Sequence, residues 1–253
     1  MNAAIGRRRF LLATAGASAL AGCSSSSTDE SPSNETDENP DAGADADASV
    51  ELEGMSATLQ YVRPATDERR PEVLATDGRQ YVVVTVGASA VEASDVALRL
   101  DGTEYASSFT ATADGRLDIG FAVPRDVAAE SGTVLVGGES KPIYRDVLDR
   151  LANPPRFTNV SFDADAEIRP GAFMGLDVRV WNKGGPGPFN GVFDVPDASP
   201  KVFSERVDSG TFASYATYVT ISEDAAPGDR TAVFDTGFEQ YTVPFTVVRS
   251  DSR

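Results

Sequence analysis

The stretch LDIGFAV at residues 117–123 places an apolar side chain at every second position. A period of two puts alternate side chains on opposite faces of a β-strand, so one face of this strand is expected to be buried and the other to face solvent. Residues 96–100 repeat the alternation and lead into Asp101-Gly102, a dipeptide typical of hairpin turns. Residues 81–86 are apolar on both faces, which predicts a central strand.

From residue 50 onward, short alternating runs are broken by Gly, Pro, Asp and Asn, and helical periodicity is nearly absent. This pattern predicts an all-β fold of two tandem immunoglobulin-like (Ig-like) β-sandwiches. We expect the first at 50–145 and the second at 156–249, with a short helical linker at 146–155 between them. Strands of the first are predicted near 51–62, 80–88, 95–101, 104–112, 116–123 and 132–137. The charged residues 64–79 are predicted to form a long loop.

The segment VRVWNKGGPGPFNGVF at residues 178–193 resembles the adhesion-type Ig-like domains of bacterial and archaeal surface proteins, sometimes called CARDB. That family's pattern is a Pro-Gly turn, an alternating strand ending in Val-x-Asn-x-Gly, a Gly turn before a second alternating strand, and a final Pro-Gly hairpin. The matching residues are Pro170-Gly171, Val178, Val180, Asn182, Gly184, Ser209-Gly210, Tyr215, Thr217, Val219, Ile221, Pro227-Gly228 and Val233. The resemblance implies a role in cell-surface interaction or spacing and implies no catalysis.

The first predicted sandwich loosely resembles the telokin-like Ig domains of prokaryotic lipoproteins. The resemblance lies in YVVVTVGAS at 81–89 and FAVPRD at 121–126.

The chain is strongly acidic, with 39 Asp and Glu against 22 Lys and Arg and a formal net charge of −17. Because phosphate binding needs a basic surface, we expect no nucleic-acid partner. Lys141, Lys183 and Lys201 are the three lysines among the 22 basic residues. This low-lysine, high-aspartate balance resembles proteins of halophilic archaea, in which high salt screens the repulsion between acids. An acidic secreted protein without salt adaptation is the alternative.

The chain has one cysteine and no histidine. It therefore lacks the residue most used as a general base near neutral pH and as a zinc ligand, and it can form no internal disulfide. These absences argue against an enzyme, and we expect no cofactor.

Residues 1–22 are predicted to be a signal peptide, with a basic start and an apolar run at 10–21 that is too short to span a bilayer. Within it, RRRFLL resembles the twin-arginine export motif. Arg7, Arg8, Phe10 and Leu11 match that motif, whereas Gly6 and Leu12 depart from it.

Leu20-Ala21-Gly22-Cys23 resembles the lipobox of prokaryotic lipoproteins, in which cleavage before the cysteine accompanies its lipidation. The alternative is a secreted protein with a stray cysteine. Residues 24–49 carry eight acids and no bases or aromatic residues, which predicts a disordered tether. Together these features predict a protein held by lipid on Cys23 at the outer face of the cell membrane.

Three acids, Asp163, Asp165 and Glu167, have alternate spacing and could in principle bind Ca²⁺ through oxygen ligands. We instead expect them to be splayed along the solvated face of one strand, because apolar residues fill the positions between them. Trp181 follows the buried position Val180 and is predicted to point away from the core, beside the loop 184–188. There it could recognise a protein or sugar partner or pack under its own loop.

A further aromatic set is predicted to lie in the core and at its rim. Its members are Tyr215, Tyr218, Phe234, Phe238 and Tyr241.

Three functions fit these patterns. We favour a non-enzymatic surface lipoprotein whose sandwiches serve protein contact, adhesion or spacing, with an extracellular or surface-layer protein as partner. The second is an accessory subunit of a membrane transport or redox complex. The third is a metal-dependent hydrolase or a carbohydrate-binding module.

Overall fold

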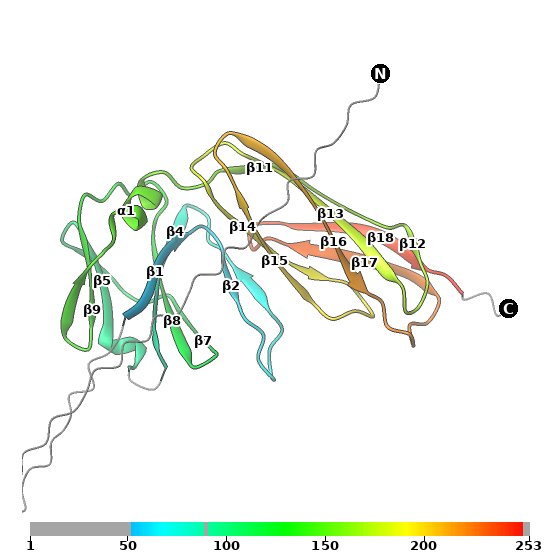
Figure 1. Ribbon diagram of the computed structural model, residues 1–253, viewed down its shortest axis with the longest axis horizontal. Coiled ribbons are helices and arrows are strands. Elements are labelled where there is room, and N and C mark those ends of the chain that lie inside the picture. Colours follow the sequence, from blue (N-terminus) through cyan, green and yellow to red (C-terminus); the bar gives the residue numbers. More distant parts are fainter. Residues whose placement is uncertain (1–51, 89–90, 250–253) are drawn as a thin grey trace, which may run out of the picture. The chain divides into compact units, whose positions relative to one another are not determined.

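The computed structural model describes residues 52–88 and 91–249, which lie in one compact unit of the chain, residues 46–253. Most of the described residues form strands, and the one α-helix among them spans eight residues (Figure 1). The all-β sandwich prediction is confirmed. In this described part, no helix has the length and apolar character needed to cross a bilayer. The predicted signal peptide, Cys23 and the acidic tether lie outside the described residues.

Two four-stranded sheets enclose the first core and form the N-terminal sandwich. One sheet has the order β1-β4-β8-β7, with β1 at Leu52–Thr58, β4 at Arg79–Gly87, β8 at Arg116–Pro124 and β7 at Phe109–Ala113. The other has the order β10-β9-β5-β6, with β10 at Glu139–Pro142, β9 at Gly132–Val136, β5 at Val96–Leu100 and β6 at Thr103–Tyr105. A short 3-10 turn at Ala93–Asp95 precedes β5.

Strand β4 is central in its sheet, as its sequence predicts, because β1 and β8 pair with its two edges. Its valines 82, 84 and 86 are buried in the core between the sheets. On its other face Tyr81 is also buried and meets Phe109 edge-on, with ring centroids 5.3 Å apart. Burial on both faces explains why the run shows no alternation.

The turn predicted at Asp101-Gly102 joins β5 to β6. Both residues have positive φ, 43° and 82°, which is the backbone shape that a two-residue hairpin turn requires. The strand predicted at 104–112 is wrong, however: β6 and β7 are separate strands in different sheets.

The loop predicted at 64–79 is also wrong in part. Strand β2 at Tyr61–Arg63 pairs with β3 at Glu72–Leu74, and Thr66 bridges to Arg69 within the connection. An ion pair between Arg63 and Glu72 joins the two strands. The predicted strand at 51–62 is correspondingly two strands, β1 and β2, separated at residues 59–60.

The helix α1 at Arg145–Ala152 belongs to the N-terminal core. Its buried residues Val147, Leu148 and Leu151 pack into that core, and the Leu151 carbonyl accepts a 2.9 Å hydrogen bond from the buried Gln80 side chain. Tyr144 lies just before the helix and is exposed. The helix is thus held on the N-terminal sandwich by its apolar face.

The C-terminal sandwich has one three-stranded and one five-stranded sheet. The smaller has the order β11-β13-β16, with β11 at Phe157–Ala164, β13 at Phe173–Asn182 and β16 at Thr211–Thr220. The larger has the order β12-β18-β17-β14-β15, with β12 at Glu167–Ile168, β18 at Gln240–Val247, β17 at Gly228–Asp235, β14 at Gly187–Asp194 and β15 at Lys201–Val207.

Phenylalanines dominate the C-terminal core. Phe234 is fully buried and lies within 6.0 Å, centroid to centroid, of Phe189, Phe193 and Phe203. A Cβ on Gly191 would lie 2.2 Å from the Phe234 ring, so only glycine leaves room for that ring.

Asn182 gives the Val-x-Asn-x-Gly segment a structural role. Its fully buried amide donates to the carbonyls of Gly185 and Val207 at 2.7 and 3.1 Å. Its Oδ1 atom accepts from the amides of Arg156 and Gly184 at 2.9 and 3.0 Å. One side chain at the end of β13 thereby satisfies four backbone groups, which lie just before β11, just after β13 and at the end of β15.

Candidate functional site

Four exposed aromatic side chains lie on the outer face of the three-stranded sheet, and we call them the aromatic face. They are Phe173, Trp181, Phe212 and Tyr218, with exposed fractions of 66, 38, 53 and 58%. Phe173 and Trp181 come from β13 and the other two from β16. Large aromatic side chains exposed together on one sheet face are typical of contact sites.

The register of β13 and β16 arranges the aromatic face as two separate pairs. Trp181 lies directly opposite Phe212, with ring centroids 6.2 Å apart. Phe173 meets Tyr218 edge-on at 5.1 Å. Eight residues along β13 separate Phe173 from Trp181, or about 26 Å at the usual rise of a strand.

Trp181 takes the orientation predicted from its sequence. It is exposed, whereas its neighbour Val180 is fully buried. Its role in recognition stays a prediction. In the further aromatic set, Phe234 is in the core, while Tyr218 and Phe238 are exposed.

The three acids considered for calcium are not on one strand, which corrects that part of the prediction. Asp163 lies on β11 in the smaller sheet, and Glu167 lies on β12 in the larger one. Asp163 is paired with Arg179 at 3.1 Å, and Asp165 accepts the Gly175 amide at 2.6 Å. The chain therefore changes sheets at Asp165, whose carboxylate binds the β13 backbone. Within the described residues, no three His, Cys, Asp or Glu side chains come together as a metal site.

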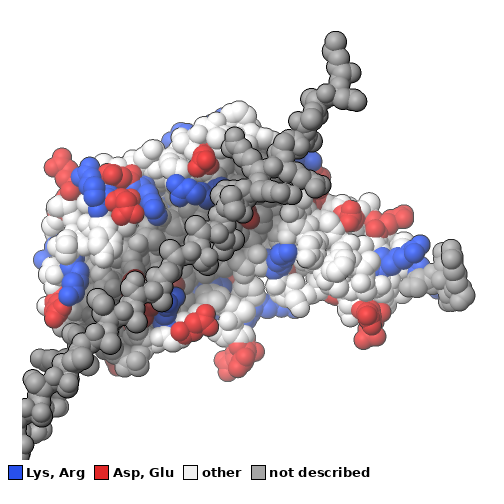
Figure 2. All heavy atoms as spheres, in the orientation of Figure 1, with Lys and Arg blue, Asp and Glu red and all other residues white. Residues whose placement is uncertain are grey.

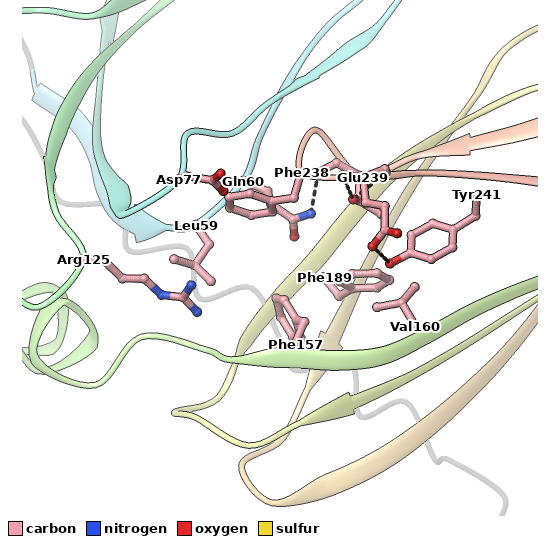
Figure 3. A pocket seen from close by; sticks show the side chains of 11 residues that line it. Leu59, Gln60, Asp77, Arg125, Phe157, Val160, Phe189, Phe238, Glu239 and Tyr241 are labelled. Atoms are coloured by element: carbon pink, nitrogen blue, oxygen red, sulfur yellow. Dashed lines mark hydrogen bonds between the residues drawn. The ribbon is translucent and has the colours of Figure 1, made fainter.

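A cavity of about 250 Å³ lies beside Gln60 (Figure 3). The N-terminal sandwich contributes Leu59, Gln60, Asp77 and Arg125 to its lining; the C-terminal sandwich contributes Phe157, Val160, Phe189, Thr236, Phe238, Glu239 and Tyr241. The lining contains neither serine, cysteine nor histidine, so it holds no Ser–His or Cys–His pair.

Two titratable side chains that line this cavity, Tyr241 and Arg125, donate hydrogen bonds to other groups of the protein. The Tyr241 hydroxyl donates to Glu239 at 2.7 Å (Figure 3). Burial, and then that carboxylate, raise the pKa of Tyr241 well above its usual value. Arg125 donates to the Pro155 carbonyl at 2.8 Å, and burial, followed by the nearby Arg156 charge, lowers its pKa.

Buried hydrogen bonds beside the cavity join β14 to the segment between β1 and β2. The Gln60 amide donates to the carbonyls of Asn190 and Thr236 at 3.0 and 2.7 Å, and its Oε1 atom accepts the Asn190 amide at 3.1 Å. The Asn190 side chain donates back to the Gln60 carbonyl at 2.8 Å. The sequence carried no sign of this contact, because 130 residues separate its partners.

Basic and acidic side chains are interspersed over the molecular face shown in Figure 2. A second, more open hollow of about 660 Å³ is lined by Arg125, Arg156 and Lys183, with Asp126 as its one acid. Those three cations form no ion pair within the described residues.

The sequence interpretation missed Phe173 and Phe212 in the aromatic face. The sequence did contain an indication, because both residues occupy the positions that alternate with the buried ones of their strands. Phe173, for example, precedes the buried Met174. A search for aromatic residues at the strand positions predicted to face solvent would have identified both.

A scan of protein-family models finds no match to this chain, and a search of curated proteins finds none either.

Proposed function

We propose that the chain is a non-enzymatic cell-surface lipoprotein whose C-terminal sandwich makes protein contacts through its aromatic face. The observation that carries the proposal is the exposure of Phe173, Trp181, Phe212 and Tyr218 on one face of a sheet. Tryptophan and tyrosine are enriched among the residues that dominate binding energy at protein interfaces. The ion pair between Arg179 and Asp163 lies between the two aromatic pairs and adds polar contacts to this surface.

The proposal includes the cellular location of the protein. Leu20-Ala21-Gly22-Cys23 would direct cleavage and lipidation at Cys23, after export directed by Arg7, Arg8, Phe10 and Leu11. Two hydrocarbon chains, at about 0.8 kcal/mol for each buried CH₂ group, hold a protein at a membrane. The acidic tether at 24–49 would then separate the sandwiches from the membrane of a halophilic archaeon.

The resemblance of 157–248 to CARDB-type domains supports a role in adhesion or spacing, with an extracellular or surface-layer protein as the partner. An accessory subunit of a membrane transport or redox complex would use the same face against an integral membrane protein. The identity of the protein that binds the aromatic face distinguishes these two functions.

The test combines cross-linking on intact cells with variants of the aromatic face. The double variant Phe173→Ala/Trp181→Ala is expected to lose the cross-linked partner that the unmodified chain captures. The matched control is Tyr144→Ala/Phe238→Ala, which removes two aromatic residues exposed elsewhere and should keep the partner. Equal capture by both variants would contradict the role of the aromatic face.

The anchor is tested separately. Cys23→Ser should move the protein from the membrane fraction to the medium. Mass spectrometry of the protein without substitutions should find lipid on Cys23. A membrane-bound Cys23→Ser protein, or an unmodified thiol at Cys23, would contradict the lipoprotein assignment.

A further inference from the structure

Strand β16 is the open edge of the three-stranded sheet. The sheet order is β11-β13-β16, and β16 pairs with β13 over ten consecutive residues without a register shift. Its sequence, TFASYATYVT, contains no charged residue, proline or glycine. A long, regular and uncharged edge presents a free row of backbone donors and acceptors to another strand.

The other sheet edges in the described part of the chain are all shorter, interrupted or charged. Strands β2, β3, β6, β7, β10 and β12 have five residues or fewer. Strands β1 and β11 each carry a register shift. Strand β15 carries Lys201, Glu205 and Arg206. Such features block pairing between edges, and β16 has none of them in its own sequence.

The hydrogen-bond pattern identifies which β16 groups face the open edge. The Ile221 amide donates to Ala172, so the odd-numbered residues of β16 face β13. The even-numbered residues therefore direct their N–H and C=O groups outward. The Tyr218 carbonyl fits this assignment, because it accepts a 2.8 Å bond from Lys201 of β15 on the side away from β13.

We propose that β16 pairs antiparallel with β16 of a second copy of this chain, joining two three-stranded sheets into one. The placement of the aromatic residues on the strand favours a second copy as the occupant. The net charge of −17 opposes association of two copies, but the uncharged β16 edge brings no charged side chain of either strand against the other, and high salt screens the remaining repulsion.

A two-fold axis level with Tyr215 places Phe212 opposite the second copy's Tyr218, and Ser214 opposite its Ala216. These even-numbered positions are the ones whose backbone groups face the open edge, so each such pair can exchange two hydrogen bonds. Shifting the register by two residues in either direction sets Phe212 opposite Ala216 or Thr220 instead. Aromatic cross-strand pairs stabilise a sheet, so they select the first register.

This register also extends the aromatic face. In one copy, Trp181 lies beside Phe212, and Tyr218 lies beside Phe173, as two separate pairs. In the paired sheet, Phe212 of one copy lies beside Tyr218 of the other, so that each aromatic row runs across four strands. Lys201 lies 4.9 Å from the Tyr218 ring and bonds its carbonyl, which has a second lone pair for the partner's N–H.

Cysteine cross-linking of the full chain tests the register. A mixture of Ser214→Cys and Ala216→Cys proteins should form a mixed disulfide between positions 214 and 216, identified by peptide mapping, because opposed residues in such pairs lie about 5.5 Å apart at Cα. The matched control mixes Ser214→Cys with Ser161→Cys on the interrupted β11 edge, and it should form none. Equal yields from the two mixtures would overturn the proposal.

Light scattering measures the association itself, in dilute and in multimolar KCl. The unmodified chain should double its mass as its concentration rises. Ala216→Pro should weaken the dimer roughly tenfold or more, because it removes an N–H that faces the open edge and leaves the bonds to β13 in place. Ala216→Glu should do the same if the proline variant fails to fold, whereas Ser161→Glu should not. A monomer at every concentration, or a dimer unaffected by both Ala216 variants, would overturn the proposal.

Discussion

Trp181 lies directly opposite Phe212 across the β13–β16 ladder, on the solvated side of a sheet whose other side is core. Because its side chain lies outside the core, we expect Trp181 to contribute little to the stability of the fold. Trp181→Ala should lower the free energy of unfolding by about 1 kcal/mol, the usual value of one exposed aromatic pair. Urea unfolding followed by circular dichroism measures this change.

The contrasting variant is Phe234→Ala. Phe234 is fully buried among other phenylalanines, so its loss should cost about 4 kcal/mol in the same assay. If Trp181→Ala were the more damaging of the two, the tryptophan would be part of the core and unavailable for contacts.

Asn182→Ala should destabilise the C-terminal sandwich by about 3 kcal/mol. Its amide satisfies four backbone groups, two of them from Arg156 and Gly184, and alanine would leave these groups without partners in a buried site. Thermal unfolding provides the measurement. Asn153→Ala is the control, because Asn153 is exposed and its loss should change stability by about 0.5 kcal/mol or less. Equal effects of the two variants would contradict this role of Asn182.

The strands that could be predicted from the sequence are those whose pattern is local. The alternation at 117–123 places Ile119, Phe121 and Val123 of β8 in the core, as predicted, but the opposite face is not solvated, because Phe109 covers Gly120 there. Asp101-Gly102 is a turn because its two residues accept positive φ. The exposure of Trp181 followed from the same counting of alternate positions. In each case the determining residues lie within a few positions of one another.

Features set by distant partners could not be predicted. The pattern at 160–168 alternates throughout, yet the chain changes sheets at Asp165, because β12 pairs with β18 some 80 residues later. The β2–β3 hairpin lacks a clear apolar alternation, and Tyr61 of β2 contacts residues far along the chain, the Asp118 carboxylate and the Phe109 ring. The pairing of Trp181 with Phe212 depends likewise on the register of β13 against β16.

Gln60→Ala should lower the stability of the whole described unit. It removes two donated hydrogen bonds and one accepted bond that join the β1–β2 segment to Asn190 and Thr236. We expect a loss of about 2 kcal/mol and a broader unfolding transition, because the two sandwiches would unfold less cooperatively. Differential scanning calorimetry detects both changes. Gln240→Ala is the control, since Gln240 is exposed and bonds only Asp235, and a broadened transition in that variant would contradict the assignment.

Because the pKa of Tyr61 is raised in the folded protein, we expect the protein to lose stability at alkaline pH. Burial, and then its 2.7 Å hydrogen bond to Asp118, raise the pKa of Tyr61 well above the value of about 10 that a tyrosine has in an unfolded chain. Below about pH 10 both states keep the proton, and the stabilisation is fully present. As the pH rises above about 10, the unfolded chain releases the proton while the folded chain keeps it, so folding becomes less favourable. The urea midpoint should therefore fall as the pH rises from about 10 to about 11.5. Tyr61→Phe should reduce this fall, and the exposed Tyr144→Phe should leave it unchanged; an identical fall in both variants would show that Tyr61 does not contribute to it.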